Sequence, residues 1–256
     1  MNQRTPAPTR RQRQHADTAA EIKAAARAHI VAAGASGLSL RAVARDVGLS
    51  APALYRYFPS LEALVVAVVV DMYGELRDYM LSECDKLPTG DLLARLVVAA
   101  HSFRQWAVSH RPEFALMFAS LIPGAVISKP GCTSADLDPE AEPYASMLRF
   151  SRVFGDLINR AWNQSDEERG FTLEIPPAPD MPPELRDEIT RCATAIGAED
   201  VPFDFAYAFH SYWVRLYGLI AMEVFGHLPV VGQAEAYFDT EVAAMAAGLG
   251  VTLSRT

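Results

Sequence analysis

The chain has 256 residues, half of them hydrophobic, so it can bury a substantial core and is not disordered as a whole. Its three cysteines, Cys84, Cys132 and Cys192, lie far apart and form no C-x-x-C pair. They therefore argue against a disulfide framework and a thiolate zinc site, and a reducing cytoplasm is the expected compartment.

The net charge of -8 is unevenly distributed along the chain. Residues 1–60 contain nine Lys or Arg against three acidic residues, which gives +6 and leaves -14 for the remainder. A basic N-terminal part favours a phosphate-rich partner, and an acidic remainder repels the same partner, so any DNA contact is expected near the N-terminus. Charge alone leaves open an ordinary solvated surface.

The first segment, residues 1–17, is rich in arginine but has no apolar stretch after it, so we do not expect it to act as a secretory signal. We expect it to be a disordered basic arm, with a minor-groove arm as the alternative. The most apolar run, residues 61–70, is shorter than the roughly 20 residues that cross a bilayer. It predicts a buried helix, and no membrane contact is expected.

Residues 39–58, SLRAVARDVGLSAPALYRYF, have the pattern of a helix-turn-helix. Ser39 is expected to cap the first helix, Gly48 to form the turn, and Ser50 to cap the second helix. Pro52 falls in the first turn of that helix, where its missing N–H has no intrahelical partner to lose.

The second helix of this motif would turn Leu54 and Phe58 inward. The start of a recognition helix enters the major groove, and the neighbouring side chains reach flanking phosphates. A helical corner with a glycine can imitate this spacing, so the motif alone is not decisive. The residues left toward solvent are Ser50, Ala51, Pro52, Ala53 and Tyr55, with Arg56 and Tyr57 beside them.

The rest of the chain repeats apolar residues at intervals of three and four, which predicts an all-α fold. One helix is expected from residue 92 to about 110, and another over residues 139–163. Residues 121–138 and 170–183 contain the prolines and glycines of loops. Two long helices should close the chain, over residues 205–225, which carries enough aromatics to pack on two sides, and over residues 234–248.

With these elements the chain resembles the TetR family of regulators over about residues 18–70. The resemblance implies a helix-turn-helix DNA-binding domain at 18–62, a three-helix head, and a larger helical domain for ligand binding and dimerisation at 63–256. It also implies that Ser39, Arg41, Tyr55 and Tyr57 hold phosphates, whereas residues 50–53 and Arg56 face bases. The family usually has lysine where this chain has Leu61. The residues that carry the resemblance are Ala33, Gly34, Leu38 to Arg41, Val43, Ala44, Gly48 to Ser50, Ala53 to Tyr55, Tyr57, Phe58, Ser60, Glu62 and Leu64.

The later part of the chain is similar, more weakly, to a subgroup named for a Trp-His-Gly pattern. Tyr217 stands where that pattern has histidine. The matching residues are Phe103, Arg104, Trp106, Ala107, His110, Pro112, Glu113, Phe114, Met117 and Phe118, then Trp213, Tyr217, Gly218, Glu223, Gly226 and His227.

The resemblance further implies a repressor that binds a palindromic DNA operator as a homodimer through its last two long helices. It would be released by a small hydrophobic effector held among the middle helices. Large apolar side chains suit such a ligand, although each is more often ordinary core. The residues we expect around the effector are Trp106, Phe114, Phe118, Met147, Phe154, Trp213 and Tyr217.

Two other classes of protein remain as alternatives. A helical enzyme has little support, because the sequence contains no H-E-x-x-H, G-x-S-x-G or phosphate loop, and His101, His110, His210 and His227 lack metal-ligand spacing. No cofactor is expected. An effector-independent architectural or activating DNA-binding protein would use the same head without needing a cavity.

Overall fold

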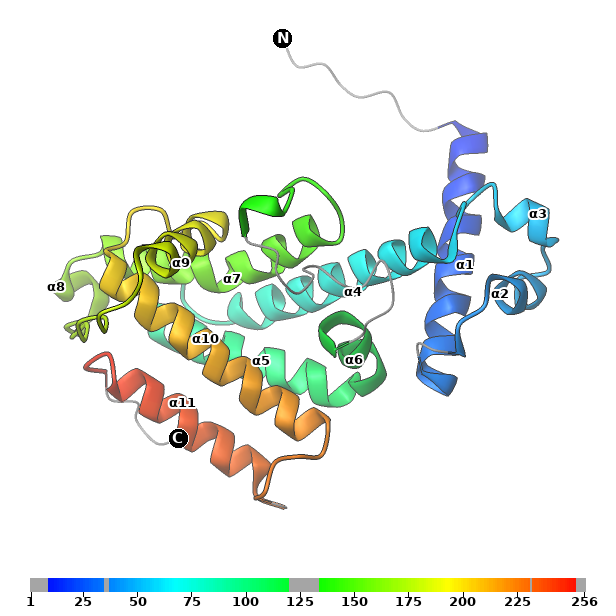
Figure 1. Ribbon diagram of the computed structural model, residues 1–256. Coiled ribbons are helices and arrows are strands. Elements are labelled where there is room, and N and C mark those ends of the chain that lie inside the picture. The colour runs from blue at the N-terminus through cyan, green and yellow to red at the C-terminus, as the bar shows by residue number, and fades with distance from the viewer. Residues whose placement is uncertain (1–8, 35–36, 120–133, 231, 252–256) are drawn as a thin grey trace, which may run out of the picture. The chain divides into compact units, whose positions relative to one another are not determined.

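The computed structural model describes residues 9–34, 37–119, 134–230 and 232–251, and its regular elements there are all helices (Figure 1). The expected all-α class is thus confirmed. The chain divides into two compact units, Met1–Met72 with Pro112–Ile127 and Tyr73–Arg111 with Ser128–Thr256. No helix in the described ranges is both long and apolar enough to cross a membrane.

The first unit begins with α1 (Arg10–Ala33), which buries Ile22, Ala26 and Ile30 along one face. The expectation of a disordered arm is wrong for residues 10–17, which form the first turns of this helix. Thr9 and Gln12 make a capping box, in which each side chain accepts a hydrogen bond from the other residue's backbone N–H, at 3.3 and 2.8 Å. Residues 1–8 lie outside the described part of the chain.

The helix-turn-helix consists of α2 (Leu40–Asp46) and α3 (Ala51–Leu54). Gly48 joins them with φ +69°, a left-handed conformation that glycine adopts without steric cost. The Leu49 N–H donates to the Ala44 carbonyl at 2.8 Å and brings the chain back toward the core. The turn predicted from the sequence is therefore present.

The helix expected around residues 61–70 is α4 (Leu61–Cys84), and the boundary between the two units falls within it. Helix α6 (Arg111–Ala119) lies farther along the chain, and from Pro112 onward it belongs to the first unit. The buried Glu113 carboxylate of α6 accepts a hydrogen bond from the Arg27 guanidinium of α1 at 3.2 Å. The compact units thus differ from the division at residue 62 predicted from the sequence, because the first unit extends to Met72 and takes in most of α6.

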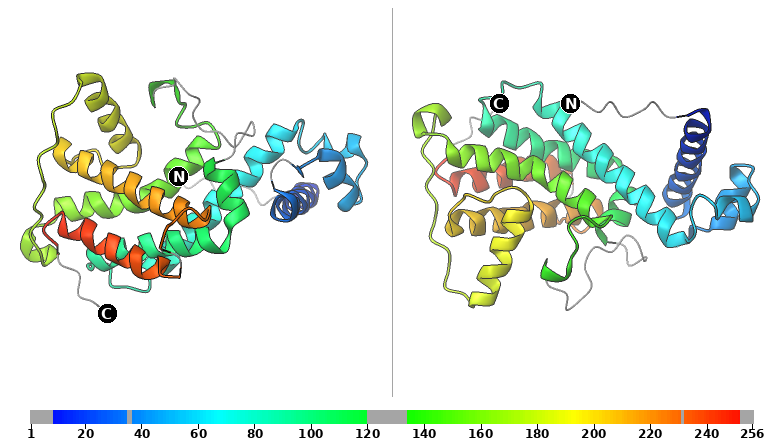
Figure 2. Two further views of the ribbon diagram at one scale, coloured as in Figure 1. Left: turned by 60° about the horizontal axis from the view of Figure 1, so that its bottom comes forward. Right: turned by 90° about the horizontal axis from the view of Figure 1, so that it is seen from above.

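The second unit is built around α5 (Leu92–Ser109) and α10 (Phe203–Val224). Helix α5 packs against α7 (Tyr144–Asn163) and α10, and α10 packs also against α9 (Pro183–Ala195) and α11 (Ala234–Ala247) (Figure 2). The two-sided packing expected for residues 205–225 is confirmed. Two short elements, η2 (Ser134–Asp136) and α8 (Asp166–Arg169), complete this unit.

Helix α7 starts five residues later than expected, after Pro143, where the Glu142 carboxylate accepts the Ser146 N–H at 3.0 Å. Its Gly155 lies so close to the chain after α9 that a Cβ would stand 2.1 Å from the Ile196 carbonyl oxygen, so no larger residue fits. The loop expected at 170–183 ends where α9 begins. Of the loop expected at 121–138, residues 121–133 lie outside the described ranges.

Candidate nucleic-acid interface and ligand pockets

The start of α3 presents the surface expected of a recognition helix. The Ser50 hydroxyl accepts the Ala53 N–H at 3.4 Å, which fixes the first turn as the sequence predicted. Pro52 and Tyr55 are exposed, and Leu54 is fully buried. Ala51 and Ala53 are half-buried, so their methyl groups border the same surface.

Several side chains expected to contact phosphates or bases are exposed around this helix. Arg41 and Arg56 are exposed and form no hydrogen bond or ion pair with the described residues. Ser39 occupies the N-cap position of α2, but its hydroxyl makes no capping hydrogen bond, so the expected cap is wrong in that respect. The Ser39 hydroxyl and both guanidinium groups are therefore available to an external ligand.

Tyr57 differs from these residues because its ring is held in place. It is half-buried and stacks on the His15 ring of α1, with ring centroids 4.5 Å apart. His15 was not predicted at this surface, because the polar composition of residues 10–17 favours a disordered arm. The Thr9-x-x-Gln12 capping box is the sequence signal that would have extended α1 to this position.

An ion pair joins α1 to α2 behind this surface. The His29 imidazole and the Asp46 carboxylate lie 2.7 Å apart. The hydrogen bond to His29 is the main cause that lowers the pKa of Asp46, and the charge of Arg45 acts in the same direction. The pair therefore helps to hold the first helix of the motif against α1.

The second unit contains a pocket of about 150 Å³ lined by apolar parts of α5, α7, α10 and α11. Val97, Phe154, Phe209 and Trp213 are among its walls, and Phe171 closes it from the segment after α8. None of the residues that line it is Asp, Glu, Lys, Arg or His. This first pocket can therefore hold only an uncharged, apolar group at low cost.

A second pocket of about 160 Å³ lies between α7, α9 and α10 and includes polar side chains. Tyr144, Ser151, Cys192 and His210 line it. Burial lowers the pKa of His210 and raises the pKa of Cys192, so both groups favour their neutral forms. Within the described residues, no group of three His, Cys, Asp or Glu side chains is placed to hold a metal ion.

Phe209 and Trp213, one helical turn apart on α10, line both pockets and so form the wall between them. The Trp213 ring stacks on Phe103 with centroids 5.8 Å apart and also contacts Phe150 and Phe154 at 5.9 and 5.6 Å. This aromatic cluster fixes the Trp213 side of the wall.

The structure brings three of the seven predicted effector residues to the pockets. Phe154 and Trp213 line the first pocket, and Met147 and Trp213 line the second. The other four line neither pocket. Tyr217 lies beside Trp213, with ring centroids 6.5 Å apart. Trp106 stacks on His110 and donates its indole N–H to Glu75 at 3.3 Å. Phe114 and Phe118 pack on each other in the first unit.

Four other pocket residues were not predicted from the sequence: Tyr144, Cys192, Phe209 and His210. The apolar breadth of residues 205–225 was a signal for Phe209, but nothing in the local pattern indicates which buried residues border empty space.

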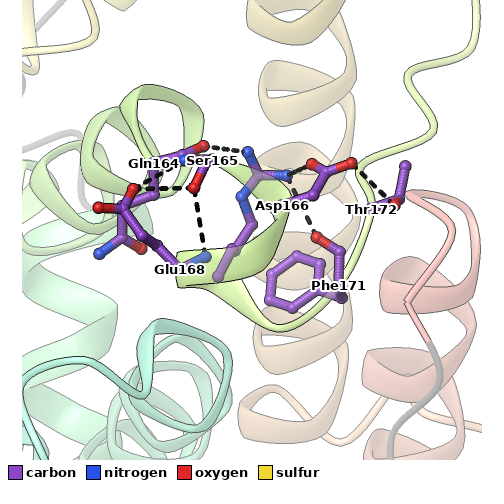
Figure 3. Close-up of polar contacts among 7 residues, drawn as sticks. Gln164, Ser165, Asp166, Glu168, Phe171 and Thr172 are labelled. Atoms are coloured by element: carbon purple, nitrogen blue, oxygen red, sulfur yellow. Dashed lines mark hydrogen bonds and ion pairs between the residues drawn. The ribbon is translucent and has the colours of Figure 1, made fainter.

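The wall of the first pocket formed by Phe171 depends on a small polar cluster around α8 (Figure 3). The Arg169 guanidinium donates to the Gln164 carbonyl at 2.5 Å and forms an ion pair with Asp166 at 3.0 Å. It also donates to the Phe171 carbonyl at 3.4 Å, and the Asp166 carboxylate accepts the Thr172 hydroxyl at 2.8 Å. These contacts hold the chain after α8 in a fixed turn.

A nearly buried ion pair joins α5 to α10 in the second unit. Two nitrogens of the Arg104 guanidinium donate to the two Glu223 carboxylate oxygens, each at 2.7 Å, and both side chains are only about one-tenth exposed. Arg111 donates to the carbonyls of Glu223 and Val224 at 3.1 and 2.6 Å, at the end of α10. These contacts fix the end of α10 relative to α5.

Two family models match the chain over most of these elements. The one described as "Bacterial regulatory proteins, tetR family" matches residues 22–68, which include the helix-turn-helix. The one described as "Tetracyclin repressor-like, C-terminal domain" matches residues 96–245, which is more than half of the chain.

Individual relatives agree with these matches. The HTH-type transcriptional regulators Rv1816 of Mycobacterium tuberculosis and Mb1846 of Mycobacterium bovis are each 34% identical to this chain over 105 residues. Each match covers 41% of this chain and 45% of the relative, so the chain matches less than half the length of these curated relatives.

Solved structures show the same fold. The regulatory protein SCO4313 superposes with a TM-score of 0.65 at 24% identity, over 93% of this chain and 98% of that one. A TetR family transcription regulator from Marinobacter aquaeolei VT8 gives 0.51 at 18% identity, over 91% and 97%. Taken with the helix-turn-helix and the two family models, these likenesses show that the chain belongs to the TetR family of bacterial transcription regulators.

Proposed function

We propose that this regulator is a repressor that binds a palindromic operator as a homodimer and is released by a small, largely apolar effector. The observation that carries the DNA-binding part is the surface around α3. Exposed cationic and hydroxyl groups there make no hydrogen bond to the described residues, beside a recognition helix whose first turn is fixed by Ser50. Such groups are suited to phosphates.

On this surface the residues divide into two kinds. Ser39, Arg41, Tyr55 and Tyr57 contact phosphates, and the phenol of Tyr57 is positioned by its stacking on His15. The first turn of α3, residues 50–53, and Arg56 face base edges in the major groove. Phosphate contacts set affinity on every sequence, and base contacts set the preference among sequences.

Dimerisation is proposed through α10 and α11. Val214, Met222 and Phe225 on α10 or directly after it, and Tyr237 on α11, expose large apolar side chains, with Val214 57% exposed. Exposed apolar side chains on two neighbouring helices are typical of an interface between protein chains. A two-fold dimer presents two recognition helices roughly 34 to 36 Å apart or a multiple of that distance.

The operator and the dimer are tested together by selecting bound sequences from random DNA and by sedimentation of the free protein. We expect an inverted repeat and a dimer. Val214→Asp with Met222→Glu should give a monomer that binds the operator far more weakly, with Asp187→Lys on exposed α9 as a control. A single asymmetric half-site, or tight binding by a monomeric wild type, would contradict the proposal.

The effector part of the proposal is supported by the two pockets of the second unit. Filling the second pocket by Met147→Trp should abolish the response to effector and leave operator binding intact. If that variant responds like the wild type, or if no apolar compound raises the melting temperature, the effector-independent architectural function becomes the better account.

We also propose that the chain belongs to the Trp-His-Gly subgroup. Supporting it, several residues of that pattern contact one another, including Arg104 with Glu223 and Trp106 with His110. The subgroup's histidine is replaced by Tyr217, which lies beside Trp213. The observed contacts explain how such a pattern stabilises the fold, and a tree of related regulators would test the assignment.

A further inference from the structure

The two pockets differ in chemistry but share one wall. The first is lined almost entirely by apolar and aromatic side chains, among which only Tyr212 and Trp213 carry a polar group, and the second has Tyr144 and His210. We propose that the effector is a neutral alcohol or phenol, whose hydroxyl group binds in the second pocket and whose apolar chain extends into the first past Phe209. This inference rests on the proposed effector function and names the chemical class of its ligand.

The charge of the ligand is limited by the residues around it. Neither pocket is lined by Lys, Arg, Asp or Glu, and burial lowers the pKa of His210, the one basic side chain in either lining, so a carboxylate, phosphate or ammonium group would be buried without an opposite charge. Burying an unpaired ion costs far more than the apolar contacts of a small ligand recover. The ligand is therefore uncharged when bound.

The size of each pocket sets the size of the two ligand parts. A dry cavity of about 150 Å³ lined by apolar side chains holds one benzene ring. The two pockets, at about 150 and 160 Å³, each have room for one ring or a short alkyl chain. A ligand with a ring in the second pocket and a chain of four to six carbons, roughly one ring's volume, in the first matches both.

The hydrogen-bonding groups of the second pocket indicate where the hydroxyl group of the ligand binds. His210 and Tyr144 are only partly buried, and neither forms a hydrogen bond with the described residues. Ser151 already donates its hydroxyl to the Met147 sulfur at 3.3 Å. A neutral imidazole offers one acceptor and one donor, and a phenol offers a donor and an acceptor. A hydroxyl on the ligand can therefore bind to His210 or Tyr144 without displacing an internal hydrogen bond.

The shared wall must open for one ligand to occupy both pockets. Trp213 is held by rings on several sides, whereas Phe209 has no ring contact among the described residues. Rotation of an aromatic side chain between staggered χ1 positions moves its ring by several ångströms at a modest cost. Phe209 is therefore the side chain that moves, and Trp213 stays.

The first test uses calorimetry of the free wild-type protein, without DNA, against phenol, 4-butylphenol, 4-hexylphenol and 4-hexylbenzoate at pH 8. We expect affinity to rise along the three phenols by up to roughly fourfold for each buried methylene group. The benzoate should bind at least tenfold more weakly than 4-hexylphenol. Equal affinities for the three phenols, or a benzoate that binds as tightly as 4-hexylphenol, would overturn the inference.

Substitutions in each pocket then test which pocket holds the apolar chain of the ligand and which holds its hydroxyl group. Val97→Trp, which fills the first pocket, should remove the gain with chain length and keep the affinity for phenol, whereas Gln105→Trp on the exposed face of α5 should keep both. His210→Leu should weaken the binding of every phenol roughly tenfold, and His227→Leu, at an exposed position, should leave that binding unchanged. Chain-length dependence that persists in Val97→Trp would place the tail elsewhere and overturn the assignment.

Phe209→Ala tests the proposed path through a gain in relative affinity instead of a loss of affinity. Removing the wall should raise the ratio of the affinity for 4-hexylphenol to the affinity for phenol severalfold. An equal change for both ligands would show that Phe209 does not separate them, which contradicts the proposed path.

Release of DNA is measured separately, by fluorescence anisotropy of the selected operator. Phenols that bind with the expected pattern but leave operator affinity unchanged would support the ligand class and contradict only the release function. Release by a charged compound, with no binding of any phenol, would support release and overturn the ligand class.

Discussion

The positively charged side chains of the two units are used differently. Around the helix-turn-helix, Arg41 and Arg56 are exposed and have no partner among the described residues. In the second unit, Arg104 is held by Glu223 and Arg95 by Asp85, with both guanidinium groups about one-tenth exposed or less. Arg41 and Arg56 therefore remain available to an external polyanion, whereas Arg95 and Arg104 hold parts of the second unit together.

The largest effect is expected from breaking the buried ion pair in the second unit. Arg104→Ala leaves the Glu223 carboxylate nearly buried without its partner, so the free energy of unfolding should fall by about 3 to 5 kcal/mol. Arg191→Ala, which breaks a solvent-screened pair with Glu188 on α9, should change the free energy of unfolding far less. Urea unfolding followed by circular dichroism compares them, and similar losses would mean that Arg104 is not a structural cation.

Removing an exposed cation from the first unit should lower the affinity for DNA and leave the stability of the fold unchanged. Arg41→Ala should weaken binding to operator and random DNA alike and lower the slope of log K against log salt by about one per protomer. Ala53→Asn should instead change the ratio of affinities for the two DNAs. Anisotropy titrations at several salt concentrations measure both, and a change of that ratio in Arg41→Ala would show that Arg41 reads bases.

Adding a cation at Leu61 tests whether the start of α4 also faces DNA. Leu61 is half-buried, and the family usually has lysine there. Leu61→Lys should therefore steepen the salt dependence of operator binding by up to about one unit per protomer. An unchanged slope with intact folding would show that this position faces elsewhere.

The smallest effect is expected from the exposed pair between His29 and Asp46. A carboxyl with a lowered pKa stabilises the fold above its ordinary pKa, and this contribution is lost as the pH falls through the lowered value. Asp46→Asn should therefore lower the melting temperature slightly at pH 6, and the difference from wild type should shrink below about pH 4. A difference that grows in acid would contradict this account of the pair.

The sequence predicted the first unit well where the signals are local. Gly48, Ser50 and Pro52 each specify one backbone position, so the turn and the start of α3 followed from them. The first turns of α1 were missed because Arg10 to His15 resemble a tail in composition, and composition outweighed the capping box at Thr9. Helix ends in the second unit were predicted to within a few residues wherever a proline or glycine stops the pattern.

The pockets were predicted less completely because they depend on contacts between distant helices. Phe154 and Trp213 lie in a pocket, but Trp106 and Phe114, equally large and apolar, pack against other side chains. A ring that borders empty space and a ring that fills the core have the same local pattern. Only the packing of α5, α7, α10 and α11 separates them.

The central claim is that DNA recognition in the first unit and ligand binding in the second unit are coupled. The direct measurement is the affinity of the wild-type protein for 4-hexylphenol, by calorimetry, with and without saturating operator. Linkage requires that operator DNA lower the affinity for the phenol by the same factor by which the phenol lowers the affinity for operator DNA. Typical couplings of this kind are roughly 5 to 150-fold. We predict equal factors within that range. Identical phenol affinity in the presence and absence of operator would contradict the account.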